Sequence, residues 1–292
     1  MVFRKLVVIG VGLIGGSVAL ALRQRGVVEQ IVGVGRTREN LDEALAAGIV
    51  DLAMTIDEPW TSELRDADMV LVATPVAQLP ALFAAMTERL SGATIVTDAG
   101  STKQDVIAAA REHLGDALPR FVPAHPIAGT EHSGAGAAVA SLFAGRNAIL
   151  TPIAETDAAA IAKVRALWES CGARVVELDP RAHDRILAAV SHLPHLLSAA
   201  YVAALAVRSD ADELFAHAGT GFRDFTRIAA ASPEMWRDIT LANREALIDE
   251  IAAYRGALDV IESAIEQRDG ESLKALFDSA SGARRAWGST RE

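Results

Sequence analysis

The chain has 292 residues, a formal charge of −10 and a single cysteine, and apolar residues make up 51% of it. This length predicts about two domains, and the apolar content excludes a disordered chain. The excess of acidic residues argues against a nucleic-acid or membrane-surface partner, because a protein that binds phosphate groups needs a stripe of basic residues on its surface. Cys171 cannot form an intramolecular disulfide, which is typical of a reducing compartment, so we expect a cytoplasmic protein.

The uncharged segment from Leu6 to Leu22 has the length and apolar content of a signal peptide or a membrane span. Four of its residues, however, are glycines. A strand over Lys5–Gly10, a glycine turn and a helix over Ser17–Gln24 explain this composition better. We therefore expect no membrane partner.

Short β-branched runs alternate with helical stretches through about the first 180 residues, which is typical of a doubly wound parallel sheet with crossover helices. Further strands are expected at Gln30–Val34, Met69–Ala73, Thr94–Asp98, Arg120–Val122, Ala148–Thr151 and Arg174–Leu178. Further helices are expected at Arg38–Ala47, Val76–Leu90, Thr102–Leu114 and Thr156–Cys171. The fold class is therefore predicted to be α/β in this part of the chain.

Strand signals stop at Asp179, so we predict an α/β domain over residues 1–178 and an all-α domain over residues 179–292. A long helix is expected from Ser232, with this serine as its cap and Pro233 in its first turn. Apolar residues recur along it at spacings of four and three, at Leu247, Ile251, Tyr254, Leu258, Ile261 and Ile265. Such a seam is typical of packing against another helix, for example in a homodimer.

The segment Gly10–Gly15 matches the pattern G-x-G-x-x-G between a predicted strand and a predicted helix. In that context, glycines let backbone N–H groups approach a pyrophosphate at a helix N-terminus. The segment therefore predicts a dinucleotide site of Rossmann type, and a glycine-rich turn without a ligand is the alternative. The cofactor contacts are expected from Gly10, Gly12, Leu13, Ile14 and Gly15.

The end of the second strand indicates which nicotinamide cofactor binds. NAD enzymes usually place an Asp or Glu there, on the ribose 2′-hydroxyl. Here the strand ends in Gly35-Arg36-Thr37-Arg38, without a carboxylate that would repel a 2′-phosphate. Because Arg36, Thr37 and Arg38 can neutralise and hydrogen-bond that phosphate, we predict that NADP is preferred, with NAD as the alternative. The competing interpretation is that the arginines are solvated at a helix start.

Polar residues follow successive strands at the edge where such sheets bind ligands. Thr74 and Pro75 follow one strand and are expected near the cofactor, Ser101 follows the next, and His125 follows the one after that. Pro126 forces His125 into an extended conformation. A hydroxyl at Ser101 and an imidazole at His125 suit the deprotonation of a substrate alcohol while a hydride leaves the same carbon.

The second half of the chain adds two polar pairs. His192 and His195 lie three residues apart, but without a cysteine cluster or a zincin-type Glu we predict no metal site. Arg223 and Arg227 lie four apart, a spacing of like charges that disfavours a helix unless an anion or Asp224 lies between them. Flanking phenylalanines favour an anion site over a solvated surface pair.

Several motifs in a fixed order now give a specific resemblance. From the first strand to about Ala242, the chain resembles the prephenate/arogenate dehydrogenases of tyrosine biosynthesis. The segments that carry the resemblance are Gly10–Gly16, Asp98–Lys103, His125–Glu131, Ala182–Asp184, Ser191–His195, Phe222–Ala229 and Met235-Trp236. The resemblance implies a Rossmann-type domain followed by a helical domain that dimerises.

The resemblance also implies a reaction: oxidative decarboxylation of prephenate to 4-hydroxyphenylpyruvate, with hydride transfer to NAD(P). His125 would accept the proton of the ring hydroxyl, and Ser101 would hydrogen-bond the same oxygen. Arg227 would bind a substrate carboxylate, with His195 positioning the side chain. Further substrate contacts are expected from His192, Thr130, Glu131, Arg223 and Trp236, with Glu131 in a polar network at the entrance.

Three alternatives stay open at this point. Arogenate, which carries an amine in place of the side-chain ketone, is the alternative substrate. A β-hydroxyacid dehydrogenase would be expected to use a lysine on a helix, but none lies between Lys163 and Lys274. A non-catalytic NADP-binding sensor would need the glycines but neither His125 nor a carboxylate-binding arginine.

Overall fold

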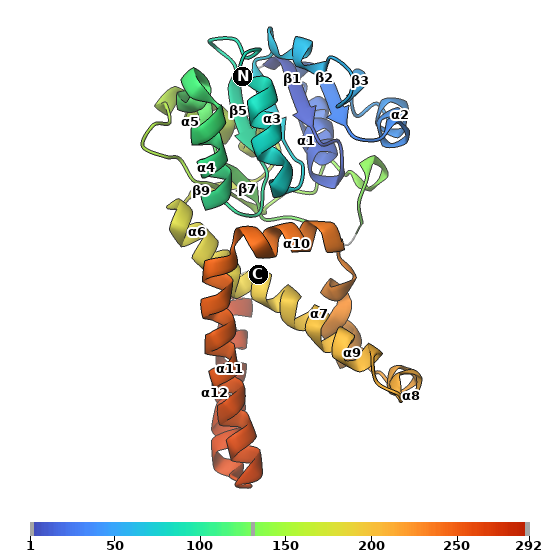
Figure 1. The fold of residues 1–292 in the computed structure, drawn as a ribbon, viewed down its shortest axis with the longest axis vertical. Coiled ribbons are helices and arrows are strands. Elements are labelled where there is room, and N and C mark those ends of the chain that lie inside the picture. The colour runs from blue at the N-terminus through green and yellow to red at the C-terminus, as the bar shows by residue number, and fades with distance from the viewer. Residues whose placement is uncertain (1–2, 130–131, 290–292) are drawn as a thin grey trace. The chain divides into compact units, whose positions relative to one another are not determined.

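The computed structural model describes residues 3–129 and 132–289, in two compact units that meet in sequence between Arg244 and Glu245. The larger unit contains a six-stranded parallel sheet in the order β3-β2-β1-β4-β5-β6 (Figure 1). Its strands are β1 (Phe3–Ile9), β2 (Val28–Gly35), β3 (Leu52–Thr55), β4 (Met69–Val72), β5 (Ile95–Asp98) and β6 (Phe121–Val122). The strand order reverses between β1 and β4, which is where such sheets bind their ligands.

Helices cover both faces of this sheet because side chains alternate along each strand. Leu6 and Val8 of β1 belong to one buried cluster, whereas Val7 and Ile9 belong to another. The first cluster includes α1 (Leu13–Gln24), α2 (Arg38–Ala46) and α5 (Ala158–Ser170), and the second includes α3 (Leu79–Met86) and α4 (Gln104–His113). The predicted doubly wound sheet is confirmed.

The last strands of this region form a separate sheet, so the prediction that they continue the parallel sheet is wrong. The strands β7 (Ala124–Pro126), β8 (Asn147–Leu150) and β9 (Arg174–Glu177) pair in that order, with β7 antiparallel to β8. Pro123, between β6 and β7, has no N–H for a strand ladder, and its carbonyl accepts the N–H of Thr151 at 2.9 Å. The chain therefore leaves the first sheet directly before His125.

Two smaller differences have local causes. The sequence pattern does not predict β3, because this strand is short and begins at Leu52, which is 39% exposed. The helix predicted from Val76 begins with a 3₁₀ turn, Val76–Gln78, and only then becomes α3, with a proline in its first turn. A proline is accepted there because the first N–H groups of a helix have no partner within the helix.

The rest of the larger unit is helical. Its elements are α6 (Pro180–Leu187), a π-helical turn (Ala188–His192), α7 (Leu193–Ala206), α8 (Ala211–Ala216), α9 (Thr220–Thr226), a 3₁₀ turn (Arg227–Ala230) and α10 (Pro233–Ala242). The predicted cap is confirmed, since Ser232 Oγ accepts the N–H of Met235. The predicted long helix is broken, because Asn243 leaves the helical conformation with φ −102° and ψ 31°. The smaller unit contains α12 (Gly270–Ser289) and all of α11 (Arg244–Glu266) except its first residue.

By length and composition alone, the segment Pro180–Ala206 is able to cross a membrane. It carries His183, Asp184 and His192, all buried. Asp184 accepts backbone N–H groups at the start of α4, and His192 contacts Asn243. These contacts make the segment part of the folded unit.

Gly12, directly before α1, and Gly15, in the first turn of α1, differ in the space around them. A Cβ on Gly15 would lie 2.2 Å from the carbonyl oxygen of Gly10, whereas a Cβ on Gly12 would meet no atom within 4 Å. We expect Gly15→Ala to lower the free energy of unfolding by about 1–3 kcal/mol, because the added methyl overpacks a backbone contact. Gly12→Ala should lower it by less than about 1 kcal/mol, the scale of a change at a helix N-cap. Urea unfolding measures both values, and equal losses would contradict the close packing at Gly15.

Candidate functional site

The glycine loop lies at the carboxyl ends of β1 and β4. Gly10 has φ +97°, and a Cβ there would lie 2.6 Å from the carbonyl oxygen of Ala73 and 3.0 Å from Thr74 Cγ2. Only glycine fits this approach to the segment that follows β4. Gly12, directly before α1, has no side chain to cap the helix and open space where a Cβ would be. The first turn of α1, which begins with Leu13 and Ile14, therefore has room for an anion such as a pyrophosphate.

Arg36 and Thr37 lie where β2 passes into α2, at the same edge of the sheet. Arg36 Nη1 lies 3.3 Å from Glu234 Oε1, in the first turn of α10. Thr37 precedes α2 without capping it through its side chain. The neighbouring Arg38 is paired with Glu58.

A buried ion pair holds β7 in place beside β5. Asp98, the last residue of β5, pairs with Lys103, and neither side chain has exposed surface. Asp98 Oδ1 accepts the N–H of Ala124 at 3.0 Å, and Lys103 Nζ donates to the carbonyl oxygen of Ala124 at 2.7 Å. Both backbone groups of the residue before His125 are thus bound by charged side chains.

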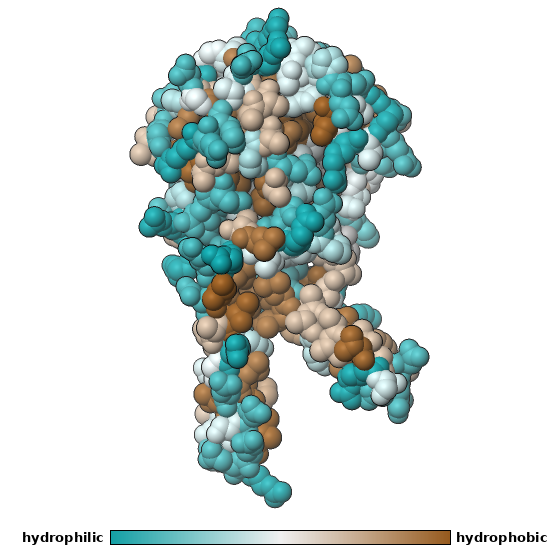
Figure 2. Space-filling view, viewed as in Figure 1, coloured by the Kyte–Doolittle hydropathy of each residue, from teal (hydrophilic) through white to brown (hydrophobic). Residues whose placement is uncertain are grey.

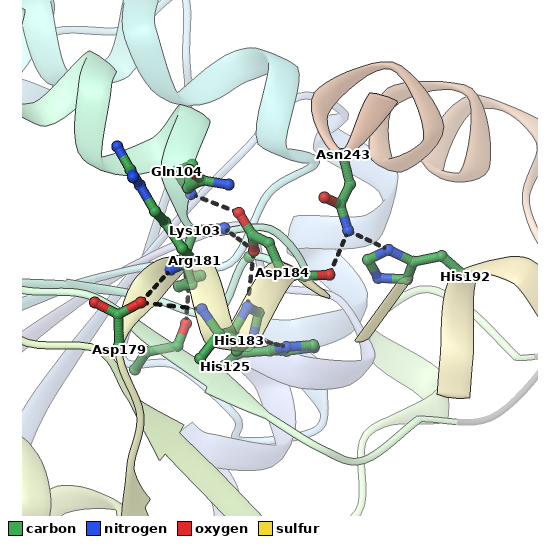
Figure 3. Close-up of polar contacts among 12 residues, drawn as sticks. Lys103, Gln104, His125, Asp179, Arg181, His183, Asp184, His192 and Asn243 are labelled. Atoms are coloured by element: carbon green, nitrogen blue, oxygen red, sulfur yellow. Dashed lines mark hydrogen bonds and ion pairs between the residues drawn. The ribbon is translucent and has the colours of Figure 1, made fainter. Parts of the chain in front are cut away.

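Asp184, on α6, connects the start of α4 to the histidines of the site (Figure 3). Its two carboxylate oxygens accept the backbone N–H groups of Lys103 and Gln104 at 2.8 and 2.9 Å. Oδ1 also lies 2.8 Å from His183 Nδ1, and His183 Nε2 lies 2.9 Å from His125 Nδ1. We refer to Asp184, His183 and His125 as the relay.

The relay fixes which nitrogen of each ring carries a proton. Because a carboxylate only accepts, His183 carries its proton on Nδ1 and donates it to Asp184. The Nε2 of a neutral His183 then accepts the Nδ1 proton of His125. This leaves Nε2 of His125 unprotonated, the state that a general base needs.

The electrostatics of the site agree with neutral rings. Burial, and then the unfavourable electrostatic interactions of a protonated His125 with His183 and Lys103, hold the pKa of His125 well below its ordinary value. Burial also lowers the pKa of His183, against the opposing effect of Asp184. Burial alone would raise the pKa of Asp184, but hydrogen bonds from His183 and two backbone N–H groups outweigh it and lower the pKa. Neutral imidazoles therefore lie beside an ionised carboxylate at neutral pH.

A second pair of histidines lies against α10. His192 Nδ1 lies 3.0 Å from Asn243 Nδ2, and burial lowers the pKa of His192 to about 4. His195 stacks on Trp236, with ring centroids 3.8 Å apart. Burial lowers the pKa of His195, and the charge of Arg227 lowers it further against a hydrogen bond to backbone. The structure thus brings His192, His195, Trp236 and Arg227 together.

Several of these side chains have polar atoms that suit a ligand. Within the part of the chain that the structure describes, three buried atoms of the site have no hydrogen-bond partner: Thr74 Oγ1, His192 Nε2 and Trp236 Nε1. A buried polar group without a hydrogen-bond partner lowers the stability of the fold by about 1–3 kcal/mol, so such groups often mark a place where a ligand binds. A bound cofactor and substrate would supply the missing partners.

The other predicted site residues have no described contact with the relay. Ser101 lies partly exposed in the turn between Asp98 and Lys103, and Pro75 precedes the 3₁₀ turn before α3. The Arg223 side chain is 75% exposed, 3.8 Å from Asp224, and has no described contact with the relay. Thr130 and Glu131 lie outside the described residues.

Sequence reasoning assigns no role to Lys103, His183, Asp184 and Asn243, which the structure places at the centre of the site. The first three belong to motifs that carry the family resemblance, and this was the available signal. Asn243 belongs to none of them. Its amide Nδ2 contacts both His192 and the carbonyl oxygen of Asp184, which only the folded chain brings within reach.

Comparison with known proteins identifies the family. A profile described as "Prephenate dehydrogenase, nucleotide-binding domain" matches residues 18–177, and one described as "Prephenate dehydrogenase, dimerization domain" matches residues 179–279. The chain belongs to the prephenate dehydrogenase family. The family resemblance and fold class predicted from the sequence are confirmed.

Members of the family match along nearly the whole chain. A prephenate dehydrogenase of Bacillus subtilis is 35% identical, over 93% of this chain and 72% of that protein. A cyclohexadienyl dehydrogenase of Zymomonas mobilis is 33% identical, over 98% of this chain and 96% of that protein. The crystal structure of Aquifex aeolicus prephenate dehydrogenase in complex with hydroxyphenyl propionate and NAD+ matches with a TM-score of 0.90 and 33% identity, covering 98% and 99% of the two chains. The chain is thus an oxidoreductase of this family that uses a nicotinamide cofactor.

The buried pair of Asp98 and Lys103 gives a stability prediction. We expect Lys103→Met to lower the free energy of unfolding by about 3–5 kcal/mol, because it leaves a carboxylate buried without its partner. The double variant Asp98→Asn/Lys103→Met should recover part of this loss. Urea unfolding measures both, with Lys274→Met, which removes an exposed ion pair with Asp278, as the matched control. Equal small losses for Lys103→Met and the control would contradict the proposed clamp on β7.

Proposed function

We propose that the protein catalyses the oxidative decarboxylation of prephenate to 4-hydroxyphenylpyruvate, with hydride transfer to NAD(P), in tyrosine biosynthesis. The relay carries the proposal, because it leaves Nε2 of His125 as an unprotonated base. This base lies in β7, beside the end of β5 and at the ligand-binding edge of the sheet. Membership of the family supports the same reaction.

In this mechanism, His125 Nε2 accepts the proton of the ring hydroxyl while the hydride leaves the carbon that carries that hydroxyl. The positive charge on His125 is stabilised through His183 by the carboxylate of Asp184. Ser101 hydrogen-bonds the same oxygen. The nicotinamide, when bound, accepts the hydride.

Loss of the ring carboxylate as carbon dioxide then makes the ring aromatic and leaves its electron pair on the ring oxygen. The proton held on His125 returns to that oxygen. Aromatisation supplies the driving force, so the protein mainly has to orient the substrate, move one proton and stabilise charge.

The substrate carries two carboxylates and approaches a chain with a formal charge of −10, so it needs a local cation. We assign Arg227 to the side-chain carboxylate, with His195, His192 and Trp236 around the side chain. Two observations support this assignment. The charge of Arg227 lowers the pKa of His195, and the 3₁₀ turn that begins with Arg227 packs against α7, which carries His195. The contacts assigned to Thr130, Glu131 and Arg223 stay predictions.

The finer choices of cofactor and substrate follow from particular residues. We propose NADP as the preferred cofactor, with NAD also accepted, because β2 ends at Gly35 and is followed by Arg36 rather than by a carboxylate. Arogenate is the second candidate substrate, since the family resemblance includes arogenate dehydrogenases. The domain boundary at 178/179 and the cytoplasmic location stay predictions.

We also propose a homodimer formed through the C-terminal helices. On α11, Leu258 is 45% and Ile265 60% exposed, and on α12, Phe277 is 69% exposed. Figure 2 shows apolar patches between hydrophilic ones on the arm that these two helices form. A second copy of the chain would cover these side chains, and the match to a dimerization domain supports this.

Purified protein mixed with prephenate and NADP at neutral pH should produce reduced nicotinamide and 4-hydroxyphenylpyruvate, with parallel assays of NAD and arogenate to rank the alternatives. We expect His125→Asn to lower kcat by roughly 10²–10⁴-fold, the usual contribution of a general base. Near-full turnover of this variant would end the assignment of His125.

The pH dependence tests the same base independently. A general base works only when it is unprotonated, and the lowered pKa of His125 keeps it unprotonated to a lower pH than an ordinary histidine. We therefore expect kcat/KM to stay constant on acidification until the pH is below about 6.5, the ordinary histidine pKa. A fall that is already half complete above that pH would contradict a desolvated base.

Light scattering of the purified protein should give the mass of a dimer at micromolar concentration. Leu258→Asp is expected to shift this mass toward the monomer, because it puts a charge on the apolar seam of α11. Asp259→Asn, on the same helix, is the matched control and should leave the dimer intact. A monomeric wild type would overturn the proposal.

A further inference from the structure

We propose that Glu234 tunes the choice between NAD and NADP by competing with the 2′-phosphate of NADP for Arg36. The proposal rests on the proposed function in one respect only, that the glycine loop binds an adenine dinucleotide. It concerns a residue of the helical part of the chain, outside the strand end that usually decides cofactor choice.

The position of α10 holds Glu234 at the cofactor edge of the sheet. The last residue of α10, Ala242, packs against the buried cluster that includes side chains of α3 and α4. The helix also contacts the 3₁₀ turn Val76–Gln78 that follows β4. Figure 1 shows α10 lying along the sheet-containing part of the larger unit. The carboxylate of Glu234, in the first turn, thereby reaches Arg36 at the end of β2.

The two arginines that follow β2, Arg36 and Arg38, have different partners. Arg38 is paired with Glu58, whose carboxylate also accepts the N–H of Thr55, and Arg38 Nη1 donates to a backbone carbonyl. Both of these partners of Arg38 thus lie in or just after β3, next to α2. Arg36 has its described ion pair with Glu234, across to α10. Arg36 is the better candidate to turn toward a ligand, and Glu234 is the charge that opposes this.

The chemistry of the two cofactors makes the competition selective. The side chains of Arg36 and Glu234 are 58% and 47% exposed, and ion pairs this exposed are weak, so a 2′-phosphate is able to displace the carboxylate. The displaced carboxylate still repels the phosphate from nearby. A 2′-hydroxyl, in contrast, donates to a carboxylate and needs no displacement. Glu234 thus places a carboxylate beside Arg36 from α10, and it reduces, without reversing, the preference for NADP that Arg36 provides.

Two nucleotide fragments isolate the 2′-phosphate from the rest of the cofactor: adenosine 2′,5′-bisphosphate and 5′-AMP. Calorimetric titration of the full-length protein measures both affinities without any turnover. We expect Glu234→Gln to tighten bisphosphate binding roughly threefold to tenfold, because it removes a nearby negative charge and releases Arg36. The affinity for 5′-AMP should change by less than about twofold. Glu169→Gln, which removes one exposed carboxylate from α5, is the matched control and should change neither affinity.

The double variant separates a direct competition from a general effect of charge. In an Arg36→Gln background, Glu234→Gln should change bisphosphate affinity by less than about twofold, because the contested cation is gone. Equal tightening in both backgrounds, or no tightening in the wild-type background, would overturn the proposal. A wild type that binds neither nucleotide would overturn the dinucleotide site itself, and with it the proposed function.

Discussion

The carboxylate of Asp184 is the group on which the geometry of the site depends. It accepts the first N–H groups of α4, where a negative charge is also favoured by the helix dipole, and it fixes the proton of His183. Lys103 connects this carboxylate to a second one, because its backbone N–H binds Asp184 while its ammonium pairs with Asp98. The helical segment from α6, the sheet and β7 are thereby joined through one lysine.

The helix α10 connects the two ends of the site. Its first turn carries Glu234, which pairs with Arg36 beside the cofactor loop, and two residues later Trp236 stacks on His195. Asn243, directly after the helix, binds the carbonyl oxygen of Asp184 and contacts His192. A helix of this length spans about 15 Å, so a single rigid element and the residue after it contact Arg36, His195 and the relay.

Local pattern was sufficient to predict five of the six strands of the parallel sheet, the glycine loop and the extended conformation of His125, because each depends on residues close in sequence. The turn of the chain into a second sheet at Pro123 was within reach of the same reasoning, since proline cannot take part in a strand ladder. Local pattern did not predict the pairs that charged side chains form with groups far away in the sequence. Lys103 and Asp184 meet across 81 residues, and Arg36 and Glu234 across 198. No periodicity or spacing encodes such pairs, and the break at Asn243 likewise depends on what its side chain meets in the folded chain.

The π-helical turn Ala188–His192 has a consequence for the length of this segment. His192 follows His183 by nine residues, which in a straight α-helix is two and a half turns and would put the two rings on opposite sides. The wider turn changes this angle, and Asn243 contacts both the backbone of Asp184 and the ring of His192. Removing one residue here would rotate His192, His195 and all of α7 by about 100° relative to α6. Because Val190 is 70% exposed, its replacement by another residue should disturb little, whereas its deletion would misplace both histidines that follow it.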